Sequence, residues 1–274
     1  MRTRCLAAVG AVVLALMLPT AAQAGPVLFE ASGANAAAIL ATVDAFRTAL
    51  GSPNNANQAG PLASGRREIN WDGGGAAATA NAPASFAGFQ NTRGALFTTD
   101  GTGFVQAVLT NTLTDLGNAT YATTFSTFSP ARVFTPVASN ITDATFFVPG
   151  SLTPAGVSAF GAVFTDVDLF GPTMIELFGL GDVPLFSKSV LAGTTPNGSL
   201  SFLGARFDSG LITRVRITTG NTPLGPNDNP AGGVEVVAMD DFLYSEPQAV
   251  PEPSSLALLA LGAVCAGVAR RRKK

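Results

Sequence analysis

The stretch LSFLGARFDSGLITRVRIT, residues 200–218, has the pattern that decides the fold. Two runs rich in Leu, Phe, Ile, Val and Thr flank an Asp-Ser-Gly segment, as is typical of β-strands bounded by a turn. Because no helical periodicity lies between such runs, we predict a mainly β protein, an antiparallel two-sheet sandwich of the jelly-roll kind. Similar runs occur at residues 66–71, 93–99, 103–110, 141–148, 157–169, 174–178 and 234–244.

One short amphipathic helix is predicted near the start of the body, after a first strand at residues 27–29. Asn35 is a suitable N-cap, and Gly51 ends the helix. Between them, apolar residues at spacings of four, three and four share one helical face. We expect this face to close one end of the sandwich. The apolar residues are Ile39, Val43, Phe46 and Leu50.

The first 24 residues have the pattern of a secretory signal peptide. Arg2 and Arg4 precede an uncharged apolar stretch at residues 6–18, and Ala22-Gln23-Ala24 fits a small-x-small cleavage site. We therefore predict a signal helix over residues 1–24, cleaved after Ala24, and one exported domain over residues 25–249.

Three features follow one another at the C-terminus. Pro251-Glu252-Pro253 precedes an apolar run of 14 residues, 256–269, and then five cations. As a helix this run rises about 21 Å, which is short of a hydrocarbon core of about 30 Å, so we expect it to span only a thin or locally thinned bilayer. The cations should remain in the cytoplasm. They are Arg270, Arg271, Arg272, Lys273 and Lys274.

This order of features closely resembles the PEP-CTERM sorting signal of bacterial envelope proteins, here over residues 250–274. The resemblance implies recognition by an exosortase, with cleavage near Pro251-Glu252-Pro253 after transient anchoring in the inner membrane. It also implies delivery to the cell envelope, the outer surface or an exopolysaccharide matrix. A plain tail anchor that is never processed is the alternative, although such an anchor would normally be longer.

The composition of the predicted body excludes several classes of function. Seven of the 16 Lys and Arg residues but only one of the 18 Asp and Glu residues lie in the two targeting segments, so the body has a net charge of about −8. Nucleic-acid binding is therefore not expected. The chain has no His, and Cys5 and Cys265 both lie outside the body. Catalytic triads that use His or Cys, zinc sites with His or Cys ligands, and haem ligation by His or Cys are excluded there. We expect no enzymatic activity, since only carboxylate chemistry or oxygen-ligated cations remain.

Two groups of carboxylates are candidates for chemistry. Asp166 and Asp168 would share one face of a strand, about 6.6–6.8 Å apart along it, a separation suited to an inverting glycosidase. Glu30 in the opening strand and Asp240 or Asp241 in the closing strand would meet if those strands ran side by side. That arrangement resembles the structural calcium site of carbohydrate-binding jelly rolls, so we hypothesise a Ca²⁺ ion there. Alternatively, one Asp is solvated and the other pairs with a nearby Arg such as Arg214 or Arg216.

The oxygen-rich loop at residues 220–233 is interpreted as an Asx-turn loop. Its Asn227-Asp228-Asn229 run lacks the alternating ligand spacing of an EF-hand.

Aromatic composition helps to rank the functions that remain. Of the aromatic residues, 19 are Phe, and only Trp71 and two Tyr carry a polar handle. Phe prefers the interior, so these rings are expected to form the core, with Trp71 the one candidate for an exposed stacking platform. We predict an exported structural or adhesive protein of the envelope or matrix, with exopolysaccharide as a candidate partner. A calcium-dependent carbohydrate-binding module and a carboxylate-dependent carbohydrate-active enzyme are the alternatives.

Overall fold

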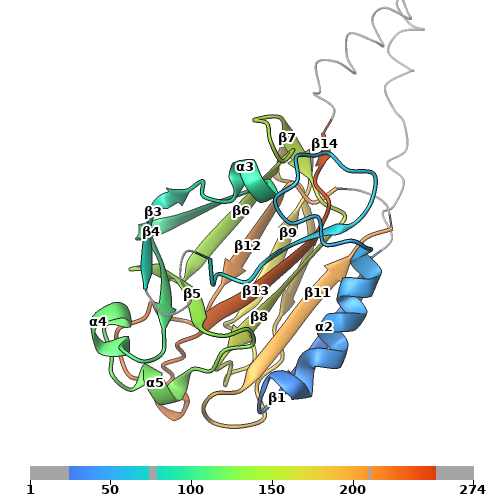
Figure 1. Ribbon diagram of the computed structural model, residues 1–274. Helices are drawn as coiled ribbons and strands as arrows, with labels where there is room; N and C mark the ends of the chain where they lie inside the picture. Colours follow the sequence, from blue (N-terminus) through green and yellow to red (C-terminus); the bar gives the residue numbers. More distant parts are fainter. Residues whose placement is uncertain (1–24, 74–78, 209–210, 251–274) are drawn as a thin grey trace, which may run out of the picture.

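The computed structural model describes residues 25–73, 79–208 and 211–250 (Figure 1). The predicted signal helix, with Ala22 and Ala24, lies outside the described residues. So do the Pro251-Glu252-Pro253 motif, the apolar run and the basic residues Arg270 to Lys274. The structure therefore bears on the predicted body and not on the two targeting segments.

The body is mainly β, as predicted, and its strands all pair antiparallel in one sheet of 14 strands. The main path through the sheet is β1-β11-β8-β13-β5-β4-β6-β12-β9-β10, with β2, β3, β7 and β14 pairing off this path. The strands are β1 (Val27–Gly33), β2 (Arg66–Ile69), β3 (Ala80–Phe86), β4 (Ala95–Val108), β5 (Arg132–Val137), β6 (Ile141–Phe147), β7 (Pro154–Gly156), β8 (Ala159–Thr165), β9 (Met174–Phe178), β10 (Pro184–Ser189), β11 (Leu200–Arg206), β12 (Arg214–Thr218), β13 (Ala238–Ser245) and β14 (Gln248–Ala249).

The structure does not separate these strands into the predicted two-sheet sandwich. One curled sheet is formed instead, because β4 runs through what were predicted to be two strands (Figure 1). Its first part pairs with β6 and its last part with β5, so β4 joins the two regions of the sheet. Gly103, with φ +158°, lies where the pairing with β5 begins. A side chain there would collide with the Ala82 carbonyl of β3, which explains the glycine.

Both faces of the central strands are covered. On β8 every residue is buried, and alternate side chains enter different clusters. Phe160, Ala162 and Phe164 lie in the main core inside the curl, whereas Ala159 and Val163 face the helix α2. This explains why β8 is an almost uninterrupted apolar run rather than an alternating one.

Helix α2 (Ala36–Leu50) confirms the predicted amphipathic helix. Asn35 caps it by accepting a hydrogen bond from the Ala38 amide at 3.2 Å, and Gly51 follows it with φ +98°. It packs on the outer face of β1, β11 and β13 rather than at one end of a sandwich (Figure 1). The buried residues are those that the spacing selected, Ile39, Val43, Phe46 and Leu50.

Several short elements were not predicted. Strand β3 contains Pro83 and several Ala residues, which have low strand propensity, so the sequence did not predict it. It forms because β4 offers it a pairing edge. Strands β5 and β10 were also missed.

Three short helices and two 3₁₀ turns complete the described body. They are α3 (Gln90–Arg93), α4 (Thr112–Leu116), α5 (Tyr121–Thr124), η2 (Leu180–Asp182) and η3 (Pro230–Gly232).

Within residues 25–73, 79–208 and 211–250, no helix combines the length and the apolar character needed to cross a membrane.

Candidate functional site

A fully buried ion pair lies where β2 meets the end of β13. Arg67 donates from Nε and Nη2 to the two carboxylate oxygens of Glu246, each at 2.6 Å. Its remaining Nη1 donates to the Ala56 carbonyl at 2.7 Å and the Gln58 carbonyl at 2.8 Å. Glu246 also accepts from the Asn55 amide at 2.9 Å. Every charge is met by a partner, so this cluster holds the irregular segment after α2 on the sheet.

Trp71 is fully buried, and its ring stacks on Phe134 with centroids 3.5 Å apart. Its indole N–H donates to the Asp240 carbonyl at 3.0 Å. Trp71 is therefore part of the core and does not form the exposed stacking platform considered from the sequence. Tyr121 and Tyr244 are also fully buried, so none of the three rings with a polar handle offers a surface for sugar.

The structure does not bring Glu30 together with Asp240 and Asp241. The prediction that the opening and closing strands run side by side is wrong, because β11 and β8 lie between β1 and β13. Glu30 pairs with Lys188 at 3.4 Å. These strand positions therefore do not provide the shared calcium site that was hypothesised.

Asp240 and Asp241 are instead bound by protein groups. The Asp240 carboxylate accepts from the Phe128 amide at 2.6 Å, and Asp241 accepts from the Ser129 hydroxyl at 2.6 Å and pairs with Arg47 at 3.4 Å. Burial and the charge of Asp241 raise the pKa of Asp240 well above its usual value. The two Asp residues are thus part of the packing between β13 and α2. The Arg that pairs with Asp241 is Arg47, and not Arg214 or Arg216 as considered from the sequence.

A third carboxylate cluster lies at the other end of the β8–β13 pair. Thr165, the last residue of β8, is in register with the first residues of β11 and β13, Leu200 and Ala238. Asp166 and Asp168 follow β8, and Asp228 lies in the loop that precedes β13. One carboxylate oxygen from each of these three Asp residues lies within 4.8 Å of the others.

Asp166 is the buried member of this cluster. Its side chain is 0% exposed, and neither carboxylate oxygen accepts a hydrogen bond from any described residue. Burial raises the pKa of Asp166 to about 9, and the charges of Asp168, Asp228 and Glu235 add to this increase. The nearby Gly198 amide lowers the pKa of Asp166 only in part, because its N–H donates to the Thr124 carbonyl at 2.8 Å rather than to Asp166.

Glu235 positions the segment that carries Asp168. Its Oε1 accepts from the amides of Asp168 at 2.7 Å and Leu169 at 3.1 Å, whereas its buried Oε2 has no hydrogen-bond donor among the described residues. Burial raises the pKa of Glu235 to about 7 and that of Asp168 to about 6. The Val236 amide donates to Asp228 at 3.0 Å, so the side chain of Glu235 and the backbone of Val236 hold the two sides of the cluster.

The cluster is reached from solvent through an open pocket of about 580 Å³, lined by Asp168 and Asp228 together with residues 193–197 and 229–231. Asp166 lies beneath this lining. The site therefore combines a buried, unpaired carboxylate with two partly exposed ones, an arrangement of oxygen donors suited to a hard cation.

Sequence reasoning found the parts of this cluster but did not join them. Asp166 and Asp168 were placed on a strand, yet β8 ends at Thr165 and Asp166 has φ +69°. The strand spacing expected of an inverting glycosidase therefore does not apply. The loop containing Asp228 was interpreted only as a turn. The signal that could have joined them was an Asp-x-Asp pair directly after a buried strand, with an oxygen-rich loop before its neighbour.

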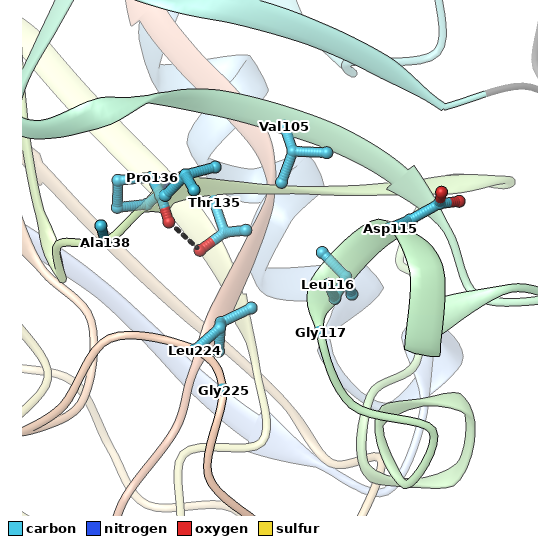
Figure 2. A pocket seen from close by; sticks show the side chains of 10 residues that line it. Val105, Asp115, Leu116, Gly117, Thr135, Pro136, Ala138, Leu224 and Gly225 are labelled. Carbon is cyan, nitrogen blue, oxygen red and sulfur yellow. Dashed lines mark hydrogen bonds between the residues drawn. The ribbon is translucent and has the colours of Figure 1, made fainter.

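A separate pocket of about 330 Å³ lies between β4, β5 and α4, and Figure 2 shows its lining. Val105, Leu116, Pro136 and Leu224 make most of it apolar. Asp115 is at its edge, where the carboxylate accepts a hydrogen bond from the Thr79 hydroxyl. With its ionisable group engaged in this way, the pocket offers shape and apolar contact but little chemistry.

Comparison with known proteins bears on the C-terminal segment. The family model of the PEP-CTERM protein-sorting motif matches residues 249–273. The chain carries a PEP-CTERM sorting motif. This confirms the resemblance inferred from Pro251-Glu252-Pro253, the apolar run and the basic end, and it implies export, membrane-associated sorting and processing by an exosortase. No curated protein and no solved structure matches the chain.

Proposed function

We propose that this protein has a structural or adhesive role at the cell envelope or in an extracellular polysaccharide matrix, after exosortase processing of its tail. The observation that carries the proposal is the sorting motif at residues 249–273. The signal-peptide pattern at residues 1–24 and a body without His or Cys are consistent with export and with a non-catalytic role.

The described body supports this role through its packing. Its largest side chains, including Trp71, Arg67 and Tyr244, are fully buried and bound by other protein groups. Exopolysaccharide is the proposed partner class because the motif directs proteins to that compartment in the family it resembles. Contact with it would involve the polar surface rather than an aromatic platform.

The sorting step is tested by expressing the full chain in hosts with and without an exosortase and locating it by fractionation. Wild type should leave the membrane fraction only where the exosortase is present, with loss of the basic tail detected by intact mass. Substituting Pro251, Glu252 and Pro253 together by Ala should keep the protein in the membrane fraction of both hosts. A matched triple substitution of exposed body residues, Leu152, Phe170 and Val183 to Ala, should be sorted like wild type.

Equal distribution of the motif variant and wild type in the exosortase host would contradict the proposal. The matrix role is tested separately, by measuring retention of the processed protein on purified exopolysaccharide. Recovery of all of it in the unbound fraction would argue against an adhesive role.

A carboxylate-dependent enzyme is the second candidate, because Asp166 and Asp168 have pKa values of about 9 and about 6 beside an open pocket. A general acid must reach the bond it protonates. Asp166 is fully buried and does not line the pocket, which favours a role other than contact with substrate. Release of reducing sugar from matrix polysaccharide, abolished by Asp168→Asn, would instead favour the enzyme.

A further inference from the structure

We propose that Asp166, Asp168 and Asp228 bind one Ca²⁺ ion at the end of the β8–β13 pair. The proposal is independent of the sorting function and places calcium at a different position from the one that the sequence suggested. Glu235 acts as a positioning residue, since it holds the backbone of Asp168 and Leu169.

Asp166 is a buried carboxylate whose hydrogen-bonding capacity is not met by the described residues. A carboxylate fully removed from water is costly unless it is paired or coordinates a metal. Both oxygens of Asp166 lack a donor among the described residues, although Asp166 is 0% exposed. Asp143, Asp182, Asp208 and Asp241, by contrast, all pair with Arg. A bound cation supplies the partner that the described residues do not.

The spacing of the three carboxylate oxygens also supports a bound ion. Ca²⁺ binds six to eight oxygens at about 2.3–2.6 Å, so two ligands on opposite sides of one ion lie about 4.6–5.2 Å apart. The three carboxylate oxygens all lie within 4.8 Å of one another, a separation in the range that ligands of one Ca²⁺ ion have. His and Cys are missing from the body sequence, so metals that prefer imidazole or thiolate ligands are disfavoured.

The carboxylate cluster is also open to solvent on one side. The pocket of about 580 Å³ reaches Asp168 and Asp228 from solvent, and its other lining residues include Thr194, Thr195 and Asn229. An ion can therefore enter, exchange part of its water for the three carboxylate oxygens and keep water on the open side. Extracellular calcium modules of this kind have dissociation constants of about 10⁻⁴–10⁻³ M.

Such an ion would connect two segments that the Glu235 carboxylate already links. Asp166 and Asp168 continue from the end of β8, and Asp228 belongs to the loop before β13. Calcium would fix that loop on the sheet and thereby the lining of the open pocket.

The test uses the full-length chain purified in a mild detergent and stripped of metal with EDTA. Titration with CaCl₂ in a calorimeter should show one saturable site per chain. The melting temperature should rise by about 5 °C or more when free calcium is about 100 times the dissociation constant. MgCl₂ at the same concentration should produce less than half of this rise.

The variants Asp166→Asn and Asp228→Asn should each weaken calcium binding at least tenfold and lose most of the calcium-dependent rise. Asp208→Asn, the same change at an acid whose side chain is 74% exposed, should behave like wild type. Circular dichroism in EDTA checks that each variant is folded, and if Asp166→Asn is not, Asp228→Asn decides. The proposal is overturned if wild type shows no saturable site, if both variants bind like wild type, or if Mg²⁺ stabilises as strongly as Ca²⁺.

Discussion

The two ends of the β8–β13 strand pair treat buried charge in opposite ways. At one end, just beyond Ser245, Arg67 and Glu246 form a bidentate pair whose remaining donors and acceptors are met by backbone groups. At the other end, just beyond Thr165, Asp166 is equally buried but has no partner among the described residues. A buried charge that is fully satisfied indicates a structural role, whereas a buried polar group without a partner requires an explanation, of which a bound ion is one.

Breaking the satisfied end should have the largest effect on stability. Arg67→Met leaves the Glu246 carboxylate buried without its guanidinium and frees the carbonyls of Ala56 and Gln58, so we expect a loss of about 3–5 kcal/mol in the free energy of unfolding. Urea unfolding of the full chain in detergent measures it. The control Arg206→Met removes an ion pair whose side chains are 38% and 74% exposed, and it should cost less than about 1 kcal/mol.

If the two Arg variants lost the same amount, the Arg67–Glu246 cluster would not stabilise the body as described. The double variant Arg67→Met/Glu246→Leu sharpens the comparison. It removes both charges, so it should be more stable than Arg67→Met alone. Recovery should be incomplete, because Asn55 and the Leu62 amide lose their acceptor on Glu246.

Asp240 lies between these extremes, because it is buried and hydrogen-bonded yet has a raised pKa. The cause is burial first and then the charge of Asp241, with Asp72 adding to it and the Phe128 amide opposing it. A carboxyl whose folded pKa is raised contributes stability that is fully present below its unfolded pKa of about 4 and is lost as pH rises through the folded pKa. Wild type should therefore lose stability with rising pH, and Asp240→Asn should reduce the slope.

Urea unfolding between pH 5 and pH 8 measures this slope, in excess calcium so that the other carboxylate cluster is held constant. The effect should be smaller than that of Arg67→Met, since Asn retains one oxygen for the Phe128 amide and can donate to Asp241. Asp208→Asn is the matched control. Parallel pH profiles for wild type and Asp240→Asn would show that this carboxyl does not carry the pH dependence.

Local features of the fold could be predicted from the sequence, whereas pairing between distant strands could not. Helix α2 was found because its cap and its apolar spacing are local, and β9 was found with its full extent for the same reason. The single curled sheet was missed because strand propensity does not reveal that β4 pairs with both β5 and β6. Pro83 and neighbouring Ala residues concealed β3, which depends on that same pairing.

The same limit applies to the candidate sites. The tail was recognised because Pro251-Glu252-Pro253, the apolar run and the cations adjoin in sequence, and the family match agrees. Glu30 and Asp240 were predicted to meet because the first and last strands were assumed to be neighbours, as in carbohydrate-binding jelly rolls. In this sheet those strands are not neighbours. Asp166, Asp168 and Asp228 were each noticed, but only the register of β8 against β13 brings them within reach of one another.

The smallest expected effect concerns the unsatisfied end of the strand pair when calcium is removed. In EDTA, Asp166→Asn should change the free energy of unfolding by less than about 1 kcal/mol, because no described donor depends on its oxygens and the new amide can donate to Asp168 or Asp228. In saturating calcium, the same variant should be clearly less stable than wild type, which alone gains from the ion. Urea unfolding of wild type and Asp166→Asn in EDTA and in saturating calcium measures how the stability difference between them depends on the ion. A large loss in EDTA would mean that Asp166 already has a partner within the protein, and the contrast with Arg67 and Glu246 would then disappear.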